Sequence, residues 1–244
     1  MNTKPILSIV IPTYNEEKAI ETTVKQFASL KIPHEVIVSD SRSTDKTIEI
    51  ATRCADKVII LAPEKKRSIA QGRNHGAAAA AGEYVAFLDA DVVILNPTAF
   101  FTKALALFEE NPKLVAVNPQ IKALPEVALW SDKMVYGILN AQFAFFNNLF
   151  NFGMAGGEFL MIKTAAFRAV DGFNESIVAS EDMDLFHRLA KIGRVRTAWG
   201  LVVFHPARRL HQEGWAPTVY RWIKNSISVW LFKKAADKEW EQVR

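Results

Sequence analysis

The sequence predicts an α/β protein with a doubly wound, mostly parallel central sheet flanked by helices. Short apolar runs, typical of buried strands, alternate along the first half of the chain with segments of helical periodicity. The alternation repeats at the spacing of strand–helix–strand units. The chain has 244 residues, of which 50% are hydrophobic and 23% charged, so it can bury a sizeable core and is neither disordered, collagen-like nor a coiled coil.

The first strand–helix unit occupies the N-terminal end. Residues 6–11 form a continuous apolar run closed by Pro12, the pattern of a strand buried on both faces. A helix is expected from Glu17, because apolar residues then recur near helical spacing as far as Leu30.

Further units follow at similar spacing. The expected strands are 35–39, 58–61, 84–88 and 114–117. A helix capped by Asp45 and one over 68–81, ended by Gly82, lie between them. Asn96 and Pro97 open another helix, because Asn is a good N-cap and Pro fits the first helical position.

The pattern changes beyond residue 117. Residues 134–157 contain no charged side chain, which is long enough for a membrane span, but five amides favour a half-buried or interfacial helix. Short helices are expected at 163–170 and at 182–192, the second ended by Gly193, with strand structure within 195–204. From Thr218 onward an amphipathic, basic and aromatic helix is expected to pack on the domain or to lie on a bilayer.

Charge and cysteine content limit the class of protein. Lys and Arg number 30 against 26 Asp and Glu, and the basic groups are scattered, so no nucleic-acid partner is expected. The single cysteine, Cys54, excludes an internal disulfide and is expected to be a small buried residue. No secretory core segment is recognisable at the start, so we expect a cytoplasmic protein.

Acidic residues follow three of the expected strands. Glu16 follows the first, Asp40 the second, and Asp89 and Asp91 the fourth. Any one of them is equally explained as a turn or cap residue, but parallel strands bring their carboxyl ends to one edge, where ligands bind. Asp89 and Asp91 project to the same side of an extended segment and can face one hard divalent cation. Because no glycine-rich phosphate loop follows the first strand, a diphosphate held through a metal ion is predicted.

Eight short motifs lie in a characteristic order along the chain. They are residues 8–17, 40–45, 73–74, 82–84, 89–91, 156–157, 172–175 and 181–185. Together they resemble glycosyltransferase family 2, inverting sugar-nucleotide transferases of the GT-A fold, over roughly residues 8–204. The resemblance implies a single catalytic domain with a nucleotide-sugar-binding half at 6–117, an acceptor half at 118–205 and a helical tail at 206–244.

The resemblance also implies a role for particular residues at the donor end. Residues expected against the nucleotide base and ribose are Pro12, Tyr14, Glu16 and Asp40. Asp89 would approach the ribose or the diphosphate, and Asp91 would be the main ligand of a Mn²⁺ or Mg²⁺ ion. His205 is a candidate third ligand, although a lone histidine is more often structural. Arg73 would lie near the diphosphate or, alternatively, face solvent from its helix.

At the acceptor end, Asp182 would be the general base, with Glu181, Gly156 and Gly157 shaping the pocket. Inverting transfer needs a base for the acceptor hydroxyl proton. An unperturbed aspartate, with a pKa of about 3.9, is a weak base at neutral pH, so burial or Glu181 is expected to raise the pKa of Asp182. The alternative is that Asp182 only caps its helix.

Three departures from the family pattern matter. Arg42 stands where glycine is usual, so the turn that presents Asp40 is expected to differ. Glu158 stands where asparagine is usual, which predicts a more acidic acceptor pocket. Residues 218–222 lack the glutamine of processive members, which favours transfer of a single sugar.

The expected function is metal-dependent transfer of one sugar from a nucleoside diphosphate, with a bias to uridine, to a hydroxyl of a lipid carrier or cell-surface glycan. The uncharged stretch and the basic tail add the expectation of peripheral contact with the inner face of a membrane. A sugar-phosphate nucleotidyltransferase, which should carry a glycine-rich loop after the first strand, and a non-catalytic nucleotide-sugar-binding protein are the alternatives.

Overall fold

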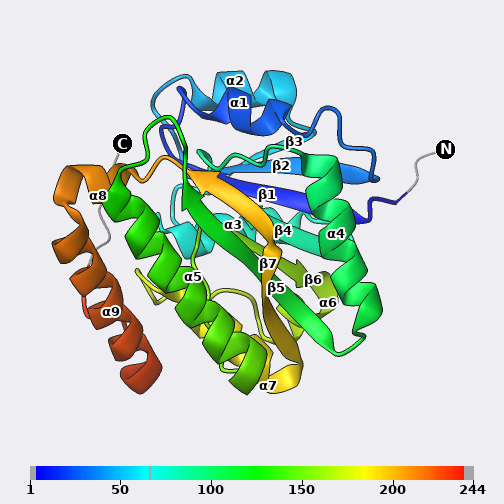
Figure 1. Cartoon of the computed structure of the whole chain (residues 1–244). Coiled ribbons are helices and arrows are strands. Elements are labelled where there is room, and N and C mark those ends of the chain that lie inside the picture. Colours follow the sequence, from blue (N-terminus) through cyan, green and yellow to red (C-terminus); the bar gives the residue numbers. More distant parts are fainter. Residues whose placement is uncertain (1–3, 66, 239–244) are drawn as a thin grey trace.

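The computed structural model describes residues 4–65 and 67–238, and the ends of the expected N-terminal segment and tail lie outside these residues. Within the described residues a seven-stranded sheet has the order β3-β2-β1-β4-β6-β5-β7 (Figure 1). The strands are β1 Leu7–Thr13, β2 His34–Asp40, β3 Lys57–Ile60, β4 Tyr84–Leu88, β5 Leu114–Ala123, β6 Phe159–Lys163 and β7 Arg194–His205. Only β6 runs antiparallel to its neighbours, so the prediction of a mostly parallel sheet is confirmed.

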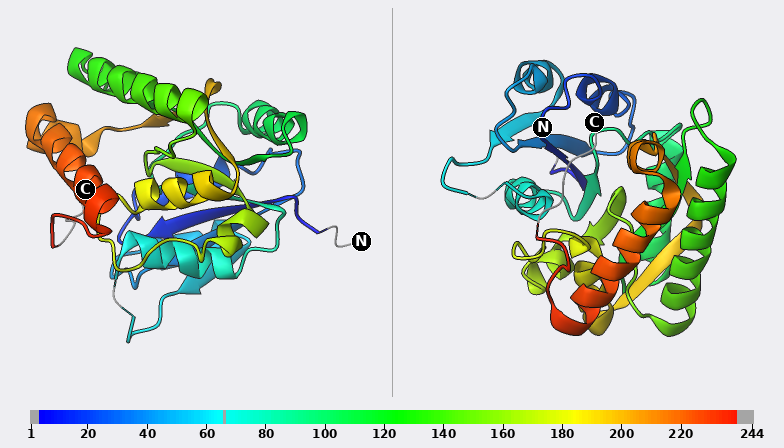
Figure 2. Two further views of the ribbon diagram at one scale, coloured as in Figure 1. Left: turned by 90° about the horizontal axis from the view of Figure 1, so that it is seen from below. Right: turned by 90° about the vertical axis from the view of Figure 1, so that its left-hand side faces the viewer.

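Helices cover both faces of this sheet (Figure 2). They are α1 Ile20–Lys25, α2 Thr47–Cys54, α3 Ile69–Ala78, α4 Pro97–Glu110, α5 Trp130–Phe150, α6 Thr164–Ala169, α7 Glu181–Ile192, α8 Arg208–Glu213 and α9 Trp215–Phe232. Helices α1, α2, α4 and α5 contribute to one apolar cluster, and α3, α6 and α7 contribute to the other. The sheet is therefore doubly wound, as predicted.

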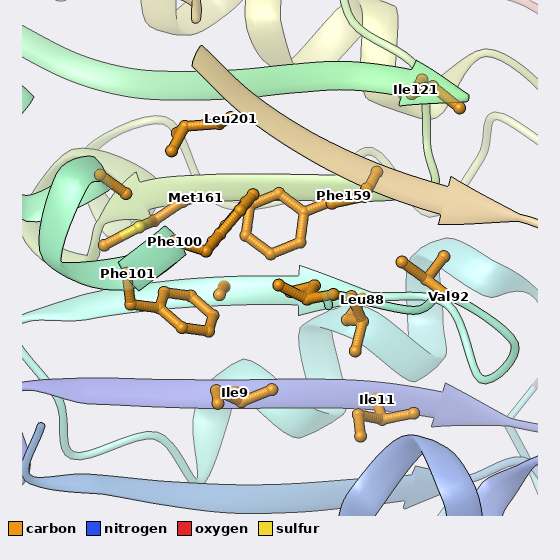
Figure 3. Packing of buried hydrophobic residues seen from close by; sticks show 14 of the residues in the cluster. Ile9, Ile11, Leu88, Val92, Phe100, Phe101, Ile121, Phe159, Met161 and Leu201 are labelled. Atoms are coloured by element: carbon orange, nitrogen blue, oxygen red, sulfur yellow. The ribbon is translucent and has the colours of Figure 1, made fainter. Parts of the chain in front are cut away.

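The larger cluster is built on strands buried along their whole length. Every residue of β1 and of β4 is buried, which explains why both strands are mostly apolar; the polar residues of β1, Ser8 and Thr13, are buried as well. Between β4 and β6, the ring of Phe100 packs edge-on against Phe101 and Phe159, with centroids 5.2 and 5.1 Å away (Figure 3). Cys54, expected to be buried, is half-buried at the end of α2.

Cap residues set the starts of two helices where the sequence placed them. The Ser68 hydroxyl accepts from the Gln71 amide at 3.2 Å, and Asn96 Oδ1 accepts from the Ala99 amide at 3.0 Å, ahead of Pro97. The ends are less regular. Helix α1 is only six residues long and gives way to turns before Leu30.

Helix α3 ends at Ala78, three residues earlier than predicted. The Glu35 carboxylate accepts from the Ala81 amide at 2.7 Å, and the Ser8 hydroxyl accepts from the Gly82 amide at 2.9 Å. These strand side chains draw the chain towards β1 and β2, so the helix stops before its last alanines. The helix also approaches the sheet closely, since a Cβ on Gly76 would lie 2.3 Å from a methyl of Val10.

The uncharged stretch forms a helix that begins and ends earlier than predicted. Helix α5 ends at Phe150, and residues 151–157 are not helical. Asn140 accepts from the Ile121 amide at 2.9 Å and donates to its carbonyl at 2.8 Å, beyond the part of β5 that β6 covers. Asn147 accepts from the amides of Gly153 and Met154, at 3.1 and 2.7 Å. The amides thus fasten one face of α5 to sheet and loop.

Within the described residues the C-terminal tail contains α8 and α9, and α9 begins three residues before Thr218, where the sequence predicts an amphipathic helix. Helix α9 lies against α5, α7 and α8, and its Val229 is 1% exposed, so one side of it packs on the domain. Its other side remains exposed, at Ile223 and Leu231 among others. Within the described residues, none of the helices combines the length and the hydropathy needed to cross a bilayer.

Candidate active site

A cleft of about 1330 Å³ opens at the carboxyl ends of β1 and β4 and reaches the start of α7. The predicted site residues that line it are Pro12, Tyr14, Glu16, Arg73, Asp89, Asp91, Gly156, Gly157, Glu181, Asp182 and His205. They come from both halves of the chain, so the topology brings together the acids that the sequence separates by about ninety positions. Asp40 is the exception.

Arg73 connects the two sides of the cleft, the end of β4 and the start of α7. Its Nη2 donates to Asp89 Oδ1 at 2.9 Å and to the Gly157 carbonyl at 2.6 Å, and its Nη1 donates to Glu181 Oε1 at 2.8 Å. The side chain is 1% exposed, so the solvent-facing alternative is wrong. Although burial opposes the charge, the carboxylates of Asp89, Glu181 and Asp182 raise the pKa of Arg73 and keep it cationic.

Asp182 is a buried acid in the first turn of α7. The N-cap of this helix is Ser180, at a φ of 63°, so the alternative that Asp182 is the cap is wrong. Asp182 is 8% exposed. Burial, followed by the charge of Glu181, raises the pKa of Asp182 well above its ordinary value, while Arg73 opposes the rise. The arrangement therefore produces a carboxylate of greater basicity than an exposed aspartate.

An aromatic ring and a guanidinium group contact each other at the end of the cleft that follows β1. Arg67 Nη1 donates to the Tyr14 hydroxyl at 2.6 Å, and its guanidinium carbon lies 4.7 Å from the centroid of the same ring. Both side chains line the cleft, together with Pro12 and Glu16. The sequence pattern singles out Tyr14 but not Arg67, which belongs to the short basic group at residues 65–67.

Asp40 does not line the cleft, which corrects its expected contact with a base. Its side chain is fully buried and accepts from the Thr13 hydroxyl at 2.8 Å, the Ser43 amide at 2.7 Å and the Ser43 hydroxyl at 2.6 Å. The turn that presents Asp40 is expected to differ because Arg42 replaces a glycine, but Arg42 adopts a φ of 66°, the left-handed conformation that glycine favours. It does so because its guanidinium donates to the carbonyls of Ala62, Pro63 and Lys65, at 2.7, 2.5 and 3.1 Å.

Arg208 is a further side chain at this site that the sequence pattern did not reveal. Its Nε donates to Asp91 Oδ2 at 2.8 Å, its Nη2 binds the same oxygen, and Nη2 lies 3.3 Å from Glu16 Oε2. Arg208 stands 117 positions from Asp91, and only its place just after the last strand hinted at a role. Tyr136 was also missed as a site residue, and its hydroxyl lies 3.4 Å from His205 Nδ1.

The carboxylates are suitable ligands for a divalent cation, and His205 is less suitable. Asp89 and Asp91 supply the oxygen ligands that Mg²⁺ and Mn²⁺ prefer. His205 Nδ1 accepts from the Ala207 amide at 3.1 Å, so the neutral ring carries its proton on Nε2, which faces Asp91 Oδ2 at 3.4 Å. A protonated nitrogen offers no lone pair. Within the described residues no three His, Cys, Asp or Glu side chains are arranged around one metal position.

Comparison of the sequence with known proteins identifies a protein family that matches most of the chain. A family model described as Glycosyl transferase family 2 matches residues 8–170. The poly-beta-1,6-N-acetyl-D-glucosamine synthase of Staphylococcus epidermidis is 29% identical over 212 residues, which cover 80% of this chain and 50% of the synthase. The chain thus spans about half the length of this curated relative.

Two solved structures share the fold. A mannosyltransferase from Pyrobaculum calidifontis, PcManGT, in complex with GDP-Man and Mn²⁺, has a TM-score of 0.66 at 22% identity, over 84% of this chain and 58% of its own. Residues 1–349 of S. aureus TarS, in complex with UDP-GlcNAc, give a TM-score of 0.61 at 20% identity, over 81% of this chain and 57% of that one. These likenesses confirm the predicted GT-A fold.

Proposed function

Because the chain belongs to glycosyl transferase family 2, we propose that it moves a single sugar from a nucleoside-diphosphate sugar to a hydroxyl of an acceptor, with inversion. One observation carries this proposal. A buried carboxylate of raised pKa, Asp182, shares a cleft with Asp89 and Asp91, and Arg73 links the two sides.

The proposed reaction is a direct displacement at the anomeric carbon. Asp182 takes the proton of the acceptor hydroxyl while that oxygen forms its bond to the anomeric carbon. The bond from that carbon to the diphosphate oxygen breaks, and its electron pair leaves with the diphosphate. Attack from the face opposite the leaving group inverts the configuration. The raised pKa of Asp182 supports this role, since it brings the basicity of the group closer to neutral pH.

The donor is proposed to be UDP-linked and to bind at the Tyr14 end of the cleft. Pro12, Tyr14 and Glu16 line that end and would flank base and ribose, with Arg67 above the Tyr14 ring. The TarS structure with UDP-GlcNAc supports a uridine donor, whereas the PcManGT structure contains GDP-Man. Asp89 would approach the ribose or diphosphate.

Asp89 and Asp91 are proposed to hold a Mn²⁺ or Mg²⁺ ion. Bound there, the ion would neutralise the charge of the departing diphosphate. The Mn²⁺ in the PcManGT structure supports this proposal. Asp91 pairs with Arg208 in the present arrangement, so the ion and the guanidinium compete for one carboxylate.

The acceptor is proposed to be a lipid-linked or cell-surface glycan hydroxyl, with Gly156, Gly157 and Glu181 shaping its pocket. The synthase relative, named for a polysaccharide, supports an acceptor of this kind. We place the enzyme in the cytoplasm, in peripheral contact with the inner face of a membrane. The exposed apolar side chains of α5 and α9 support the membrane contact.

A donor panel tests the proposal. Purified protein is incubated with UDP-, GDP- and dTDP-sugars with Mn²⁺, Mg²⁺ or EDTA, and donor hydrolysis and thermal stability are measured. At least one nucleotide sugar should raise the melting temperature and undergo slow, cation-dependent hydrolysis. If none of the nucleotides or nucleotide sugars stabilised the protein, the proposed function would be wrong.

A further inference from the structure

The cleft continues past Asp182 as an apolar groove between α5 and α9. These helices contact each other and lie side by side in Figure 1 and in the right view of Figure 2. The groove is defined here by its apolar lining, which is Leu139 and Phe143 from α5, Phe152 from the following loop, and Trp222, Ile227 and Trp230 from α9. One continuous cavity thus has a charged end at the catalytic acids and an apolar end between two helices.

Aromatic contacts close the floor of the groove. The ring of Phe152 lies 5.7 Å from that of Phe146 on α5 and 6.1 Å from that of Trp230 on α9. Because Phe152 bridges the two helices, it fixes their separation at this end. The groove is therefore built by packing between the helices.

The apolar lining is better matched to a hydrocarbon chain than to a free sugar, and Tyr136, Gln142 and Ser226 are the polar side chains that α5 and α9 add to the cavity. Sugar hydroxyls need hydrogen-bond partners when they leave water, and the side chains of Leu139, Phe143 and Ile227 offer none. A hydrocarbon chain has no such requirement, and its transfer from water to this lining is favourable.

The outer surfaces of the same helices extend the apolar character. Ile138 and Leu149 on α5 are 61% and 66% exposed, and Phe232 on α9 is 70% exposed. Each helix begins with an exposed tryptophan, Trp130 or Trp215, a side chain typical of the membrane interface. These exposed apolar side chains form one row on α5 and one on α9, and such rows on two neighbouring helices fit the surface of a bilayer.

The charge of the tail complements an anionic bilayer. Residues 206–244 contain eight lysines and arginines against four acidic residues. Lys238, which lines the cleft, and Lys234 are both exposed. Basic residues beside an apolar face attract anionic headgroups.

We propose that the groove between α5 and α9 holds the hydrocarbon chain of an amphiphilic acceptor drawn from an anionic bilayer, while its polar head reaches Asp182. This inference rests on the proposed function and narrows it, because a lipid rather than a soluble glycan becomes the acceptor. The chain enters from the exposed rows of α5 and α9, which lie on the bilayer.

Chain-length dependence of binding provides the first test. Dodecyl phosphate and ethyl phosphate, both below any micelle concentration, are titrated against the full chain by calorimetry. Dodecyl phosphate should bind at least about 100-fold more tightly, because full burial of one methylene alone is worth roughly a fourfold gain. Equal affinities would overturn the inference.

Matched variants locate the effect. Ile227→Asp changes a groove residue that is 53% exposed, and Ile138→Asp changes an α5 residue that is 61% exposed and lies outside the lining. The first should lose at least about tenfold in dodecyl phosphate affinity, and the second should keep the wild-type value. The same loss in both, or in neither, would show that the chain does not lie in the groove.

Vesicle binding tests the bilayer as the source. Wild-type protein should sediment with phosphatidylcholine vesicles that contain phosphatidylglycerol, and Ile138→Asp should reduce the bound fraction. The inference that α5 and α9 lie on a bilayer would be overturned if the wild type did not sediment with the vesicles. It would also be overturned if the protein formed a concentration-dependent dimer that buries the exposed rows of these helices. UDP binding by the wild type, followed as a thermal shift in parallel, keeps a failure here distinct from a failure of the proposed function.

Discussion

Asp182 carries a cost at the scale of a single residue, because the environment that makes it basic also disfavours its charge. Burial and Glu181 raise the pKa of Asp182 in the folded state. Such a group stabilises the fold below its unfolded pKa, and that contribution is lost as the pH rises through the folded pKa. At neutral pH the ionised carboxylate is therefore less favourable for folding than a neutral side chain of the same shape.

The substitution Asp182→Asn should separate these two effects. Asparagine cannot take the hydroxyl proton, so transfer should fall by about 10²–10⁴-fold. The melting temperature at neutral pH should rise, because the disfavoured charge is gone. Turnover and thermal unfolding of both proteins measure the two effects.

Donor binding serves as the control for this variant and should be retained. A transfer rate of Asp182→Asn close to that of the wild type would exclude Asp182 as the base.

Glu181→Gln should move the pH profile. The charge of Glu181 is the second cause of the raised pKa of Asp182, so its removal lowers that pKa. A base must be ionised to act, and the acid limb of kcat/KM should therefore shift to lower pH. Rates measured across pH would show the shift, and an unchanged limb would contradict the coupling.

Arg208→Ala should strengthen cation binding. Arg208 pairs with Asp91 in the cleft, and removing it frees that carboxylate. We expect Mn²⁺ affinity to rise about tenfold, which corresponds to about 1.4 kcal/mol, close to the lower end of the range for a hydrogen bond to a charged group. Spin-resonance titration of free Mn²⁺ measures it, with Asp91→Ala as the variant that should lose binding. Weaker Mn²⁺ binding by Arg208→Ala would contradict the competition.

At this scale the sequence predicted which residues line the cleft better than it predicted their partners. Asp89, Asp91 and Asp182 follow recognisable motifs, and they do line one cavity. Asp40 has an equally clear motif, but its carboxylate accepts hydrogen bonds from Thr13 and Ser43 instead of lining the cleft. A buried carboxylate needs such donors close by. Arg208 has no local pattern, since its partner lies far away in the chain.

At the scale of elements, α3 depends on a face of small side chains. Gly76 faces Val10 of β1, and a Cβ there would lie 2.3 Å from a methyl carbon. A larger residue would push helix and strand apart, and α3 carries Arg73. Close packing of α3 therefore holds a cleft residue in place.

The substitution Gly76→Ala should lower the free energy of unfolding by about 1–3 kcal/mol through overpacking. Gly137→Ala is the matched control, because it lies in α5 with nothing within 4 Å of the added methyl. There the helix should gain up to about 1 kcal/mol. Urea unfolding of both variants measures the difference, and equal effects would contradict the packing explanation.

Local chemistry predicts the starts of elements better than their ends. Ser68 and Asn96 cap helices through bonds to residues three positions on, which a sequence pattern contains. The end of α3 depends on Glu35 and Ser8, which belong to other strands. The inner face of α5 likewise depends on residues outside the helix: Asn140 bonds to Ile121 of β5, and Asn147 bonds to Met154 in the loop that follows α5.

At the scale of the whole molecule, Arg73 joins the two halves. It contacts Asp89 after β4, and Glu181 and the Gly157 carbonyl in the second half. Breaking such a buried pair leaves uncompensated carboxylates close together.

Arg73→Ala should therefore reduce the free energy of unfolding by about 3–5 kcal/mol. Arg73→Lys keeps the charge but not the planar fork, and it should recover only part of the loss. Denaturant unfolding of the three proteins tests this order. An alanine variant as stable as the wild type would show that other contacts join the halves.

The parallel half of the sheet follows from the alternation of strands and helices, whereas the position of β6 does not. No pattern in the sequence of residues 159–163 predicts that they pair with Tyr84–Leu88 on one side and with Val117 on the other. That pairing is decided by long-range packing, including the contact of Phe159 with Phe100.

The late arrival of β6 sets an order for biosynthesis. Strands β1 to β4 are complete at Leu88, yet the second edge of β4 finds its partner only when Phe159–Lys163 has been translated. Until then a nascent chain presents an apolar strand with unpaired amides and carbonyls, a template for intermolecular pairing. We therefore expect chaperone capture during that interval to raise the yield of native protein, and a fragment ending before residue 159 to keep that edge of β4 unpaired.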